Sequence, residues 1–187
     1  MVPLMSLWLP ILLSGVAVFI VSSIIHMLLP YHRDDHKTLA DDDGVRAALR
    51  PFAIPPGDYV VPGTTPGEKW DSPARMEKLK EGPAILMTVY PNGPPAMGLS
   101  LVLWFVYSLV VGVFAAYVVG ALVGPGADYM VVHRFTGTVA FAGYGLALLQ
   151  GSIWYKRSWF TTFKSVFDAL VYALVTGGVF GWLWPAA

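Results

Sequence analysis

Four long apolar stretches constrain the fold of this chain more than any other feature of its sequence. They run over about 7–29, 98–123, 129–155 and 166–184. A helix needs roughly 20 apolar residues to cross the hydrocarbon core of a bilayer, and each stretch is long enough. With 56% hydrophobic and 13% charged residues, the chain has too little polar surface for a soluble domain of this size. We therefore expect an all-α membrane protein, a four-transmembrane-helix bundle forming a single membrane domain over 1–187.

The distribution of charge predicts how this bundle is oriented. Four crossings place the segments 30–97 and 156–165 on one side of the membrane, and both termini on the other. Of the 12 Lys and Arg residues, all except Arg134 fall in those two segments. Because positively charged loops tend to stay in the cytoplasm, we expect a multi-pass protein of the bacterial inner (plasma) membrane. Its long loop would be cytoplasmic and both termini would lie outside, in the periplasm.

The long loop, 30–97, carries local signals of a small cytoplasmic cap. Acidic residues precede an apolar pattern over Val45–Phe52 that suits a short amphipathic helix. A second short helix is predicted from Ser72 and Pro73 to a stop at Gly82. The segments 58–61 and 85–90 are rich in β-prone residues and bounded by Pro and Gly, which is compatible with a β-hairpin.

Small side chains recur every fourth residue on two of the predicted helices. This spacing puts each set on one helix face, where two backbones can approach closely in lipid. Packing within the bundle is the favoured interpretation, and docking onto another protein is the alternative. The residues are Ser108, Gly112, Ala116 and Gly120 on the second helix, and Ala169, Ala173, Gly177 and Gly181 on the fourth.

Few residues offer cofactor chemistry. The chain has no cysteine, which excludes disulfides, thiolate catalysis and iron–sulfur clusters. A haem held between two helices needs two histidines at one depth. His26 and His133 lie near opposite ends of their helices, separated by something near 25 Å of a ~30 Å hydrocarbon core. No cofactor is therefore predicted.

A metal site is one hypothesis for the segment after the first helix. His32 and His36 are four residues apart with Asp34 and Asp35 between them, so a helix would bring both imidazoles onto one face. The alternative, which we favour, is that these charged residues form a solvated collar where the chain leaves the membrane.

A polar pair is predicted inside the apolar segments. His26 lies one turn from the end of the first helix, and Asp168 lies at the start of the fourth, so their depths match. Ionisable groups in lipid usually find a partner. We expect a contact between the two side chains, joined by Gln150 or Ser22, which either fixes helix register or relays a proton or an ion.

A second polar group lies at the predicted outer face, at the start of the third helix. It comprises Asp128, His133 and Arg134. Arg134 is expected to extend its guanidinium toward the lipid headgroups. Between the two ends, the bundle offers only scattered hydroxyl groups, too few to line a water-filled pathway through a single copy.

The helical regions resemble a known family. The similarity covers Ser6–His36, Met97–Val123 and the run SIWYKRSWFTTFKSVFDALVYALVTGGVFGWLWP from Ser152 to Pro185. On these residues the chain resembles an uncharacterised family of bacterial four-helix integral inner-membrane proteins. The resemblance implies topology and a bacterial origin, and assigns a role to no residue.

These features favour a non-enzymatic membrane protein, an accessory, assembly or stabilising subunit of a larger membrane complex. Its partners would be the lipid bilayer and other membrane proteins or a second copy of itself. A formal net charge of zero gives no reason to expect nucleic acid. The alternative is a small proton- or metal-coupled transporter that uses His26 and Asp168, or His32 and His36. An enzyme acting on lipid is less favoured, because only Asp34, Asp35 and the nearby histidines lie at headgroup level.

Overall fold

The computed structural model describes all 187 residues, which form two compact units. The first is a helical bundle made of Met1–His36 and Ala96–Ala187, and the second comprises Lys37–Pro95. The bundle contains α1 (Trp8–Ser23), α4 (Met97–Leu122), α5 (Tyr129–Tyr144), α6 (Leu149–Tyr155) and α7 (Trp159–Trp182). Short turns of other helix types extend it: 3₁₀ turns at Leu4–Leu7, Pro30–His32 and Leu146–Leu148, and a π-helical turn at Ile24–Leu28.

Three of these helices are long and apolar enough to cross a membrane. They are Leu4–Leu28, Met97–Leu122 and Trp159–Trp182, with 25, 26 and 24 residues. The third predicted stretch is divided, because α5 ends at Tyr144 and a 3₁₀ turn separates it from α6. The count of four crossings therefore stays a prediction.

The start of the last long helix differs from the sequence prediction. α7 begins at Trp159, well before the expected position near 166. Polar residues of this first part are buried, but they have partners that the sequence does not reveal. The Thr162 hydroxyl lies 2.7 Å from that of Ser152, and Lys164 Nζ donates to Asp35 Oδ1 at 2.7 Å. Because these polar groups are satisfied, the helix extends through a segment that local hydropathy assigns to a loop.

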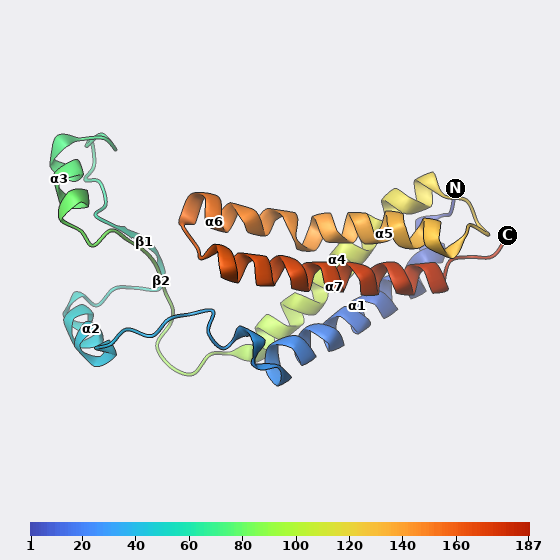
Figure 1. Ribbon diagram of the computed structural model, residues 1–187, viewed down its shortest axis with the longest axis horizontal. Coiled ribbons are helices and arrows are strands. Elements are labelled where there is room, and N and C mark those ends of the chain that lie inside the picture. Colours follow the sequence, from blue (N-terminus) through green and yellow to red (C-terminus); the bar gives the residue numbers. More distant parts are fainter. The chain divides into compact units, whose positions relative to one another are not determined.

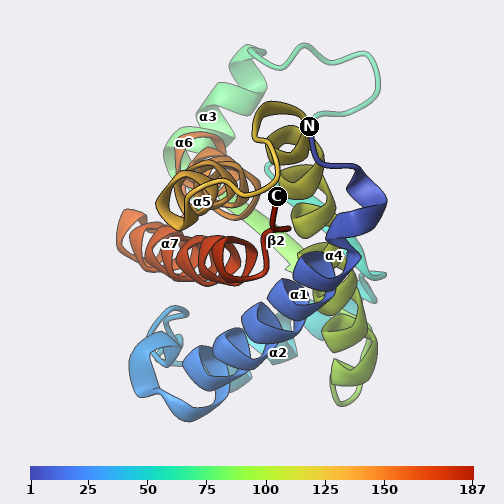
Figure 2. The same ribbon diagram turned by 90° about the vertical axis from the view of Figure 1, so that its right-hand side faces the viewer.

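The helices of the bundle pack in a closed order. α1 contacts α4 and α7, and α5 contacts α4 and, most extensively, α7 (Figures 1 and 2). Both chain ends are bonded near the turn between α4 and α5: Val2 N donates to Gly120 O, in the last turn of α4, at 2.8 Å, and Gly126 N, in the turn itself, donates to Pro185 O at 2.8 Å. The termini and this turn therefore share one end of the bundle, as Figure 1 shows.

The two small-residue faces are used inside the bundle. Seven of the eight residues are buried and Gly181 is half-buried. A Cβ at Gly120 would lie 2.7 Å from the Val2 carbonyl oxygen, and one at Gly177 would lie 2.7 Å from the His133 carbonyl oxygen. Missing side-chain bulk thus allows α4 to contact the N-terminal segment and α7 to contact α5.

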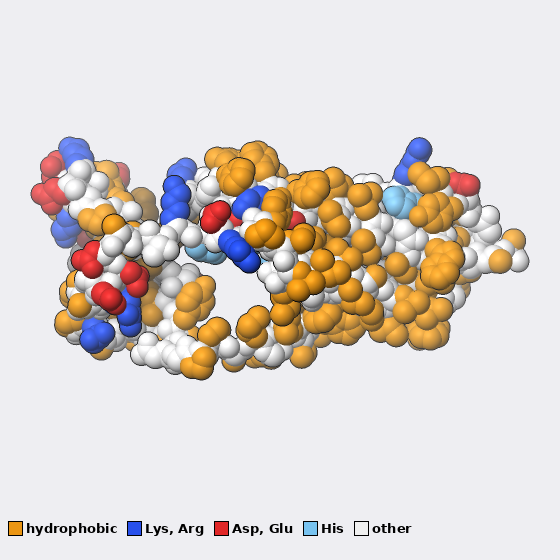
Figure 3. Space-filling model, turned by 60° about the horizontal axis from the view of Figure 1, so that its bottom comes forward, with side chains coloured by type: hydrophobic (Ala, Val, Ile, Leu, Met, Phe, Trp, Pro, Cys, Tyr) orange, Lys and Arg blue, Asp and Glu red, His pale blue; other side chains and the backbone are white.

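The outer surface of the bundle is largely apolar. Figure 3 shows hydrophobic side chains over most of the helices on one face, with charged side chains mainly near their ends. Large side chains such as Phe114, Phe160 and Trp182 are more than half exposed, at 63%, 72% and 78%. Soluble monomers rarely expose continuous apolar surface on this scale, whereas lipid tails would cover it.

The second unit holds two short helices and a small sheet. α2 (Asp42–Leu49) begins where the Asp41 carboxylate accepts a hydrogen bond from Gly44 N, and α3 (Pro73–Glu81) begins where the Ser72 hydroxyl accepts one from Arg75 N. β1 (Gly57–Val61) and β2 (Ile85–Val89) pair antiparallel, with Tyr59 opposite Met87. The predicted strands therefore pair, although α3 lies in their connection, so they are not joined by a tight hairpin turn.

Candidate metal centre

The first ligand candidate, His26, lies in the π-helical turn that ends the first long helix. A π turn inserts an extra residue and changes the direction in which side chains leave the helix. The His26 Nδ1 atom lies 3.0 Å from the carbonyl oxygen of Ser22. A carbonyl oxygen can only accept a hydrogen bond, so Nδ1 carries the proton. In the neutral ring the lone pair is then on Nε2, which makes no hydrogen bond within the chain.

His32 is brought beside His26 by a reversal of the chain. The helix ends at Leu28, and the 3₁₀ turn Pro30–His32 follows. Proline has no N–H to continue a helix, and it restrains the residue before it to an extended conformation. The His32 ring stacks on that of His26, with ring centroids 4.4 Å apart and planes 11° from parallel.

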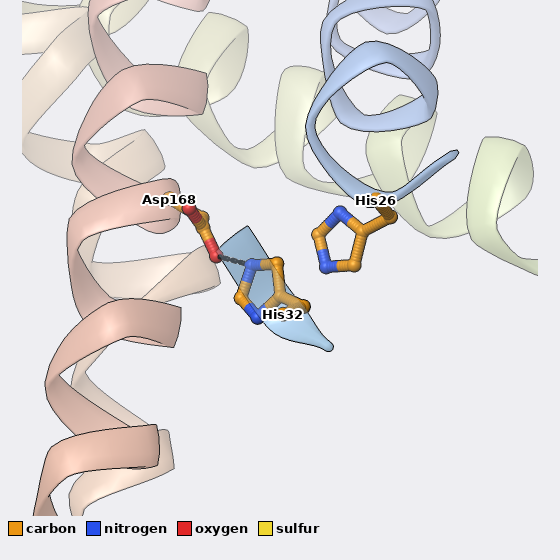
Figure 4. A group of neighbouring side chains, drawn as sticks. All are labelled: His26, His32 and Asp168. Atoms are coloured by element: carbon orange, nitrogen blue, oxygen red, sulfur yellow. Dashed lines mark hydrogen bonds and ion pairs between the residues drawn. The ribbon is translucent and has the colours of Figure 1, made fainter. Parts of the chain in front are cut away.

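Asp168 completes the group from the opposite side. It comes from α7, is only 4% exposed, and its Oδ2 lies 2.9 Å from His32 Nε2. Figure 4 shows the three side chains from the two helices and the intervening turn, with His32 between the other two. Their potential ligand atoms all lie within 4.8 Å of one another.

A second pair of charged residues holds this turn in place. The other His32 nitrogen, Nδ1, lies 2.6 Å from Asp35 Oδ2. Lys164, one turn before Asp168 on α7, donates to Asp35 Oδ1 and to the Tyr31 carbonyl, each at 2.7 Å. Burial raises the pKa of Asp35, but the hydrogen bonds from Lys164 and His32 lower it by more, so the pKa lies below its ordinary value.

The charges of this network are not balanced at Asp168. Lys164 neutralises Asp35, whereas no Lys or Arg contacts Asp168. A buried carboxylate needs a compensating charge. Two sources fit the geometry: a proton that makes His32 cationic, or a metal ion held by His26, His32 and Asp168.

The arrangement meets several requirements of a metal site. Two imidazoles and a carboxylate suit Zn²⁺ or non-haem Fe²⁺. In metal sites the non-ligating nitrogen of a histidine usually donates to a carboxylate or a backbone carbonyl. Here Nδ1 of His32 faces Asp35 and Nδ1 of His26 faces the Ser22 carbonyl. Ligands about 2.1 Å from a tetrahedral ion lie about 3.4 Å apart. His32 Nε2 and Asp168 Oδ2, now 2.9 Å apart, would therefore separate slightly, and the wider distances of the group, up to 4.8 Å, would shorten.

The structure brings together only part of the residues proposed from the sequence. The hypothesis that His32 and His36 share one helix face is wrong, because the chain leaves helical geometry after His32. His36 and Asp34 are exposed and outside the group, whereas Asp35 supports it. A 3₁₀ turn spans only a few residues, which is too short for histidines four apart to align.

The predicted pair of His26 and Asp168 lies within the group, with a different connection. Neither Gln150 nor Ser22 joins the two side chains. Gln150 is exposed, and the Ser22 hydroxyl accepts a hydrogen bond from Trp104 Nε1 at 2.8 Å. His32 is instead the residue that bonds to Asp168. The sequence signals that could have identified it are Pro30, which permits the chain to reverse, and Lys164, which lies four residues before Asp168.

The other polar group does not form a site. Asp128 caps α5 by accepting a hydrogen bond from Met130 N at 2.8 Å. His133 is half-buried beside the Tyr129 ring, at 5.7 Å between centroids, and Arg134 is exposed without an ion pair. The three residues therefore make separate local contacts.

Comparison with known proteins adds no identification. No family model, no curated protein and no solved structure matches the chain. The family resemblance noted from the sequence stays a prediction.

Proposed function

We propose that this chain is a multi-pass inner-membrane protein that binds a divalent transition-metal ion, Zn²⁺ or Fe²⁺, through His26, His32 and Asp168. The observation that carries the proposal is the direction of the two imidazoles. Both Nδ1 atoms face oxygen acceptors, while His32 Nε2 lies 2.9 Å from Asp168 Oδ2 and His26 Nε2 has no partner within the chain. The function is then metal handling at the membrane boundary. This is the metal-coupled alternative that the sequence suggested, but with His26, His32 and Asp168 as ligands in place of His32 and His36.

The proposed topology has four crossings, with α5 and α6 together forming the third. Both termini bond to residues at the α4–α5 turn, which supports their lying on the same side of the membrane. Termini on the same side require an even number of crossings, as in the proposed topology. The concentration of Lys and Arg in 30–97 and 156–165 supports a cytoplasmic position for those segments, and hence for the metal site.

Proton transfer is a second candidate function, and one specific contact favours it. His32 faces a carboxylate at each of its nitrogens, Asp35 at 2.6 Å and Asp168 at 2.9 Å. A ring in this position can receive a proton at one nitrogen and release it from the other. The accessory-subunit prediction stays open, but the small-residue faces do not favour it because they are occupied within the bundle.

Metal binding can be tested on the full chain purified in a mild detergent with a streptavidin-binding tag, which adds no histidine cluster. We expect equilibrium dialysis and elemental analysis to find one Zn²⁺ per chain. His26→Ala and Asp168→Asn should each weaken binding at least 100-fold, because each removes a direct ligand. Asp35→Asn should weaken it by about 10- to 100-fold, the usual effect of losing a group that orients a ligand.

His36→Ala is the matched control, since it removes a nearby exposed histidine outside the group. It should retain wild-type affinity. If the wild-type chain binds no Zn²⁺ or Fe²⁺, or if His36→Ala weakens binding as much as His26→Ala, the metal proposal is wrong. Loss of a pH-dependent proton flux in vesicles on His32→Ala, without metal binding, would support the relay instead.

A further inference from the structure

A cavity of about 530 Å³ lies beside the metal group, inside the helical bundle. It is lined by α1 with its π-helical turn, α4, α5 and α7. His26 and Asp168 belong both to the metal group and to the lining of the cavity, so the two are adjacent. Pockets for small organic ligands commonly enclose about 300–1,000 Å³.

Four aromatic rings of the lining form one cluster. Trp104 has its ring centroid 5.6 Å from that of Tyr107, 6.1 Å from Tyr144 and 5.8 Å from Tyr172. Tyr144 and Tyr172 are themselves in edge contact at 5.7 Å. Such a cluster presents both ring faces and ring edges, which favours a flat apolar molecule over a round or strongly polar one.

The exposed residues of the lining, which form the mouth of the cavity, are mainly aliphatic, with His26 and Tyr107 beside them. Met27, Met97 and Leu101 are exposed by 66%, 56% and 37% and line its edge. All three lie at the ends of helices apolar enough to cross a membrane. A ligand with a hydrocarbon tail could therefore leave its tail among lipid chains while its head enters the cavity.

One buried polar group in the lining has no partner in the chain. Tyr172 is 4% exposed, and its hydroxyl makes no hydrogen bond. Buried hydroxyls are nearly always bonded, so this one calls for an acceptor from elsewhere. A saturated acyl chain contains no hydrogen-bond acceptor, whereas the oxygen of a carbonyl group is one.

The protein side chains that line the cavity offer no cation to a phosphate head. Asp168 is its only acidic residue, and no Lys or Arg lines the cavity. In the metal-free chain, a phosphate here would face a carboxylate without a compensating cation. The favoured head is therefore uncharged.

From these observations we propose that the cavity binds the head of a lipid-soluble quinone, a planar, uncharged ring with carbonyl acceptors and a hydrocarbon tail. Tyr172 would donate to one carbonyl oxygen and the aromatic cluster would hold the ring. The proposal concerns binding, and it stands on Tyr172, the aromatic cluster and the aliphatic mouth; of the proposed metal ligands it uses only Asp168, for the charge of the lining.

Decylubiquinone is a suitable probe, and its binding to the full chain in detergent can be measured by equilibrium dialysis in the presence and absence of EDTA. We expect saturable binding of one molecule per chain. Tyr172→Phe keeps the ring but removes the hydroxyl, and should weaken binding about fivefold, the effect of one hydrogen bond. Leu101→Trp should abolish binding by filling the mouth.

Matched controls separate these effects from general damage to the bundle. Leu103→Trp adds the same bulk on the same helix at an exposed position outside the cavity, and Tyr155→Phe removes an exposed hydroxyl; neither should alter affinity. Binding that is non-saturable, or unchanged in both Tyr172→Phe and Leu101→Trp, would overturn the proposal. So would displacement of decylubiquinone by a phospholipid at equal concentration. Binding that survives EDTA would show that the cavity acts without the metal.

Discussion

Lys164 shows how a single residue connects the turn after the first helix to α7. Its ammonium is 9% exposed and contacts the Asp35 carboxylate, itself 9% exposed, and the Tyr31 carbonyl. Attraction between two such groups is strong, but so is the cost of removing them from water. The pair therefore adds little net stability while both members are present, and much instability when only one remains.

Lys164→Met should consequently destabilise the chain by about 3 kcal/mol, because it removes the only lysine or arginine that pairs with the buried Asp35 carboxylate and leaves His32 as its one partner. Adding Asp35→Asn should recover more than half of that loss, since the double variant no longer contains the orphaned charge. Unfolding of the purified protein in mixed detergent–SDS micelles would measure both. Lys156→Met, which alters an exposed lysine, should change the free energy of unfolding by less than about 0.5 kcal/mol. An equal loss in the single and double variants would contradict the role given to the pair.

Glu68 provides a pH prediction in the second unit. Hydrogen bonds from the Ser72 hydroxyl, the Thr65 N–H and the Thr65 hydroxyl lower the pKa of Glu68 to about 2 from an ordinary 4.5. A depressed carboxyl pKa stabilises the folded loop above the ordinary pKa, and this contribution is lost as pH falls toward 2. The loop around Thr65 should therefore loosen between pH 4.5 and 2.

Carbon-13 NMR of the labelled Glu side chains can follow this titration, with Glu68→Gln assigning the signal. We expect a midpoint near 2 in the wild type. In Ser72→Ala the midpoint should rise, because the first of the three hydrogen bonds is lost. A wild-type midpoint at 4 or above would contradict the hydrogen bonds described for Glu68.

At the scale of elements, α5 and α7 depend on a close backbone approach. A Cβ on Gly177 would lie 2.7 Å from the His133 carbonyl oxygen, which cannot move away without shifting α5. At the adjacent Gly178 the nearest atom would be the Tyr129 hydroxyl at 3.7 Å, an ordinary contact. Substitutions at these two neighbouring glycines of one helix are therefore expected to have different effects on stability.

Gly177→Ala should destabilise the bundle by about 1–3 kcal/mol, the usual cost of overpacking. Gly178→Ala should be neutral or stabilising by up to about 1 kcal/mol, because alanine favours helix more than glycine does. The same micelle unfolding experiment compares them directly. Equal effects at both positions would show that α5 and α7 do not approach as closely as described.

At the scale of the whole molecule, the sequence predicts best what depends on local composition. Apolar stretches and helix caps are local properties, so three long helices and both short helices of the second unit were expected near their observed positions. The start of α7 and the break after Tyr144 depend on partners or geometry that hydropathy does not contain. The same holds for the candidate site. The matching depths of Asp168 and His26 could be predicted from the sequence, but the position of His32 depends on the chain reversal at Pro30, which hydropathy does not show.

The membrane topology of the whole chain can be decided by labelling experiments. Because the chain has no cysteine, single cysteines can be introduced without background. The exposed positions Thr64, Ser158, Pro125 and Ala186 report on the long loop, the α6–α7 connection, the α4–α5 turn and the C-terminus. The proposed four crossings predict that an impermeant maleimide added to intact cells labels Pro125→Cys and Ala186→Cys only. Thr64→Cys and Ser158→Cys should react after permeabilisation.

Ser158→Cys and Ala186→Cys distinguish four crossings from three. If α5 and α6 do not cross together, the chain after Pro125 stays outside until α7, so Ser158→Cys would be labelled in intact cells and Ala186→Cys would not. Val2 bonds to Gly120 near the end of α4, and Pro185 bonds to Gly126 in the α4–α5 turn. These bonds favour the first outcome, because both termini then share a side with the turn. Labelling of Thr64→Cys in intact cells would instead reverse the orientation, and would move the proposed metal site to the outer face.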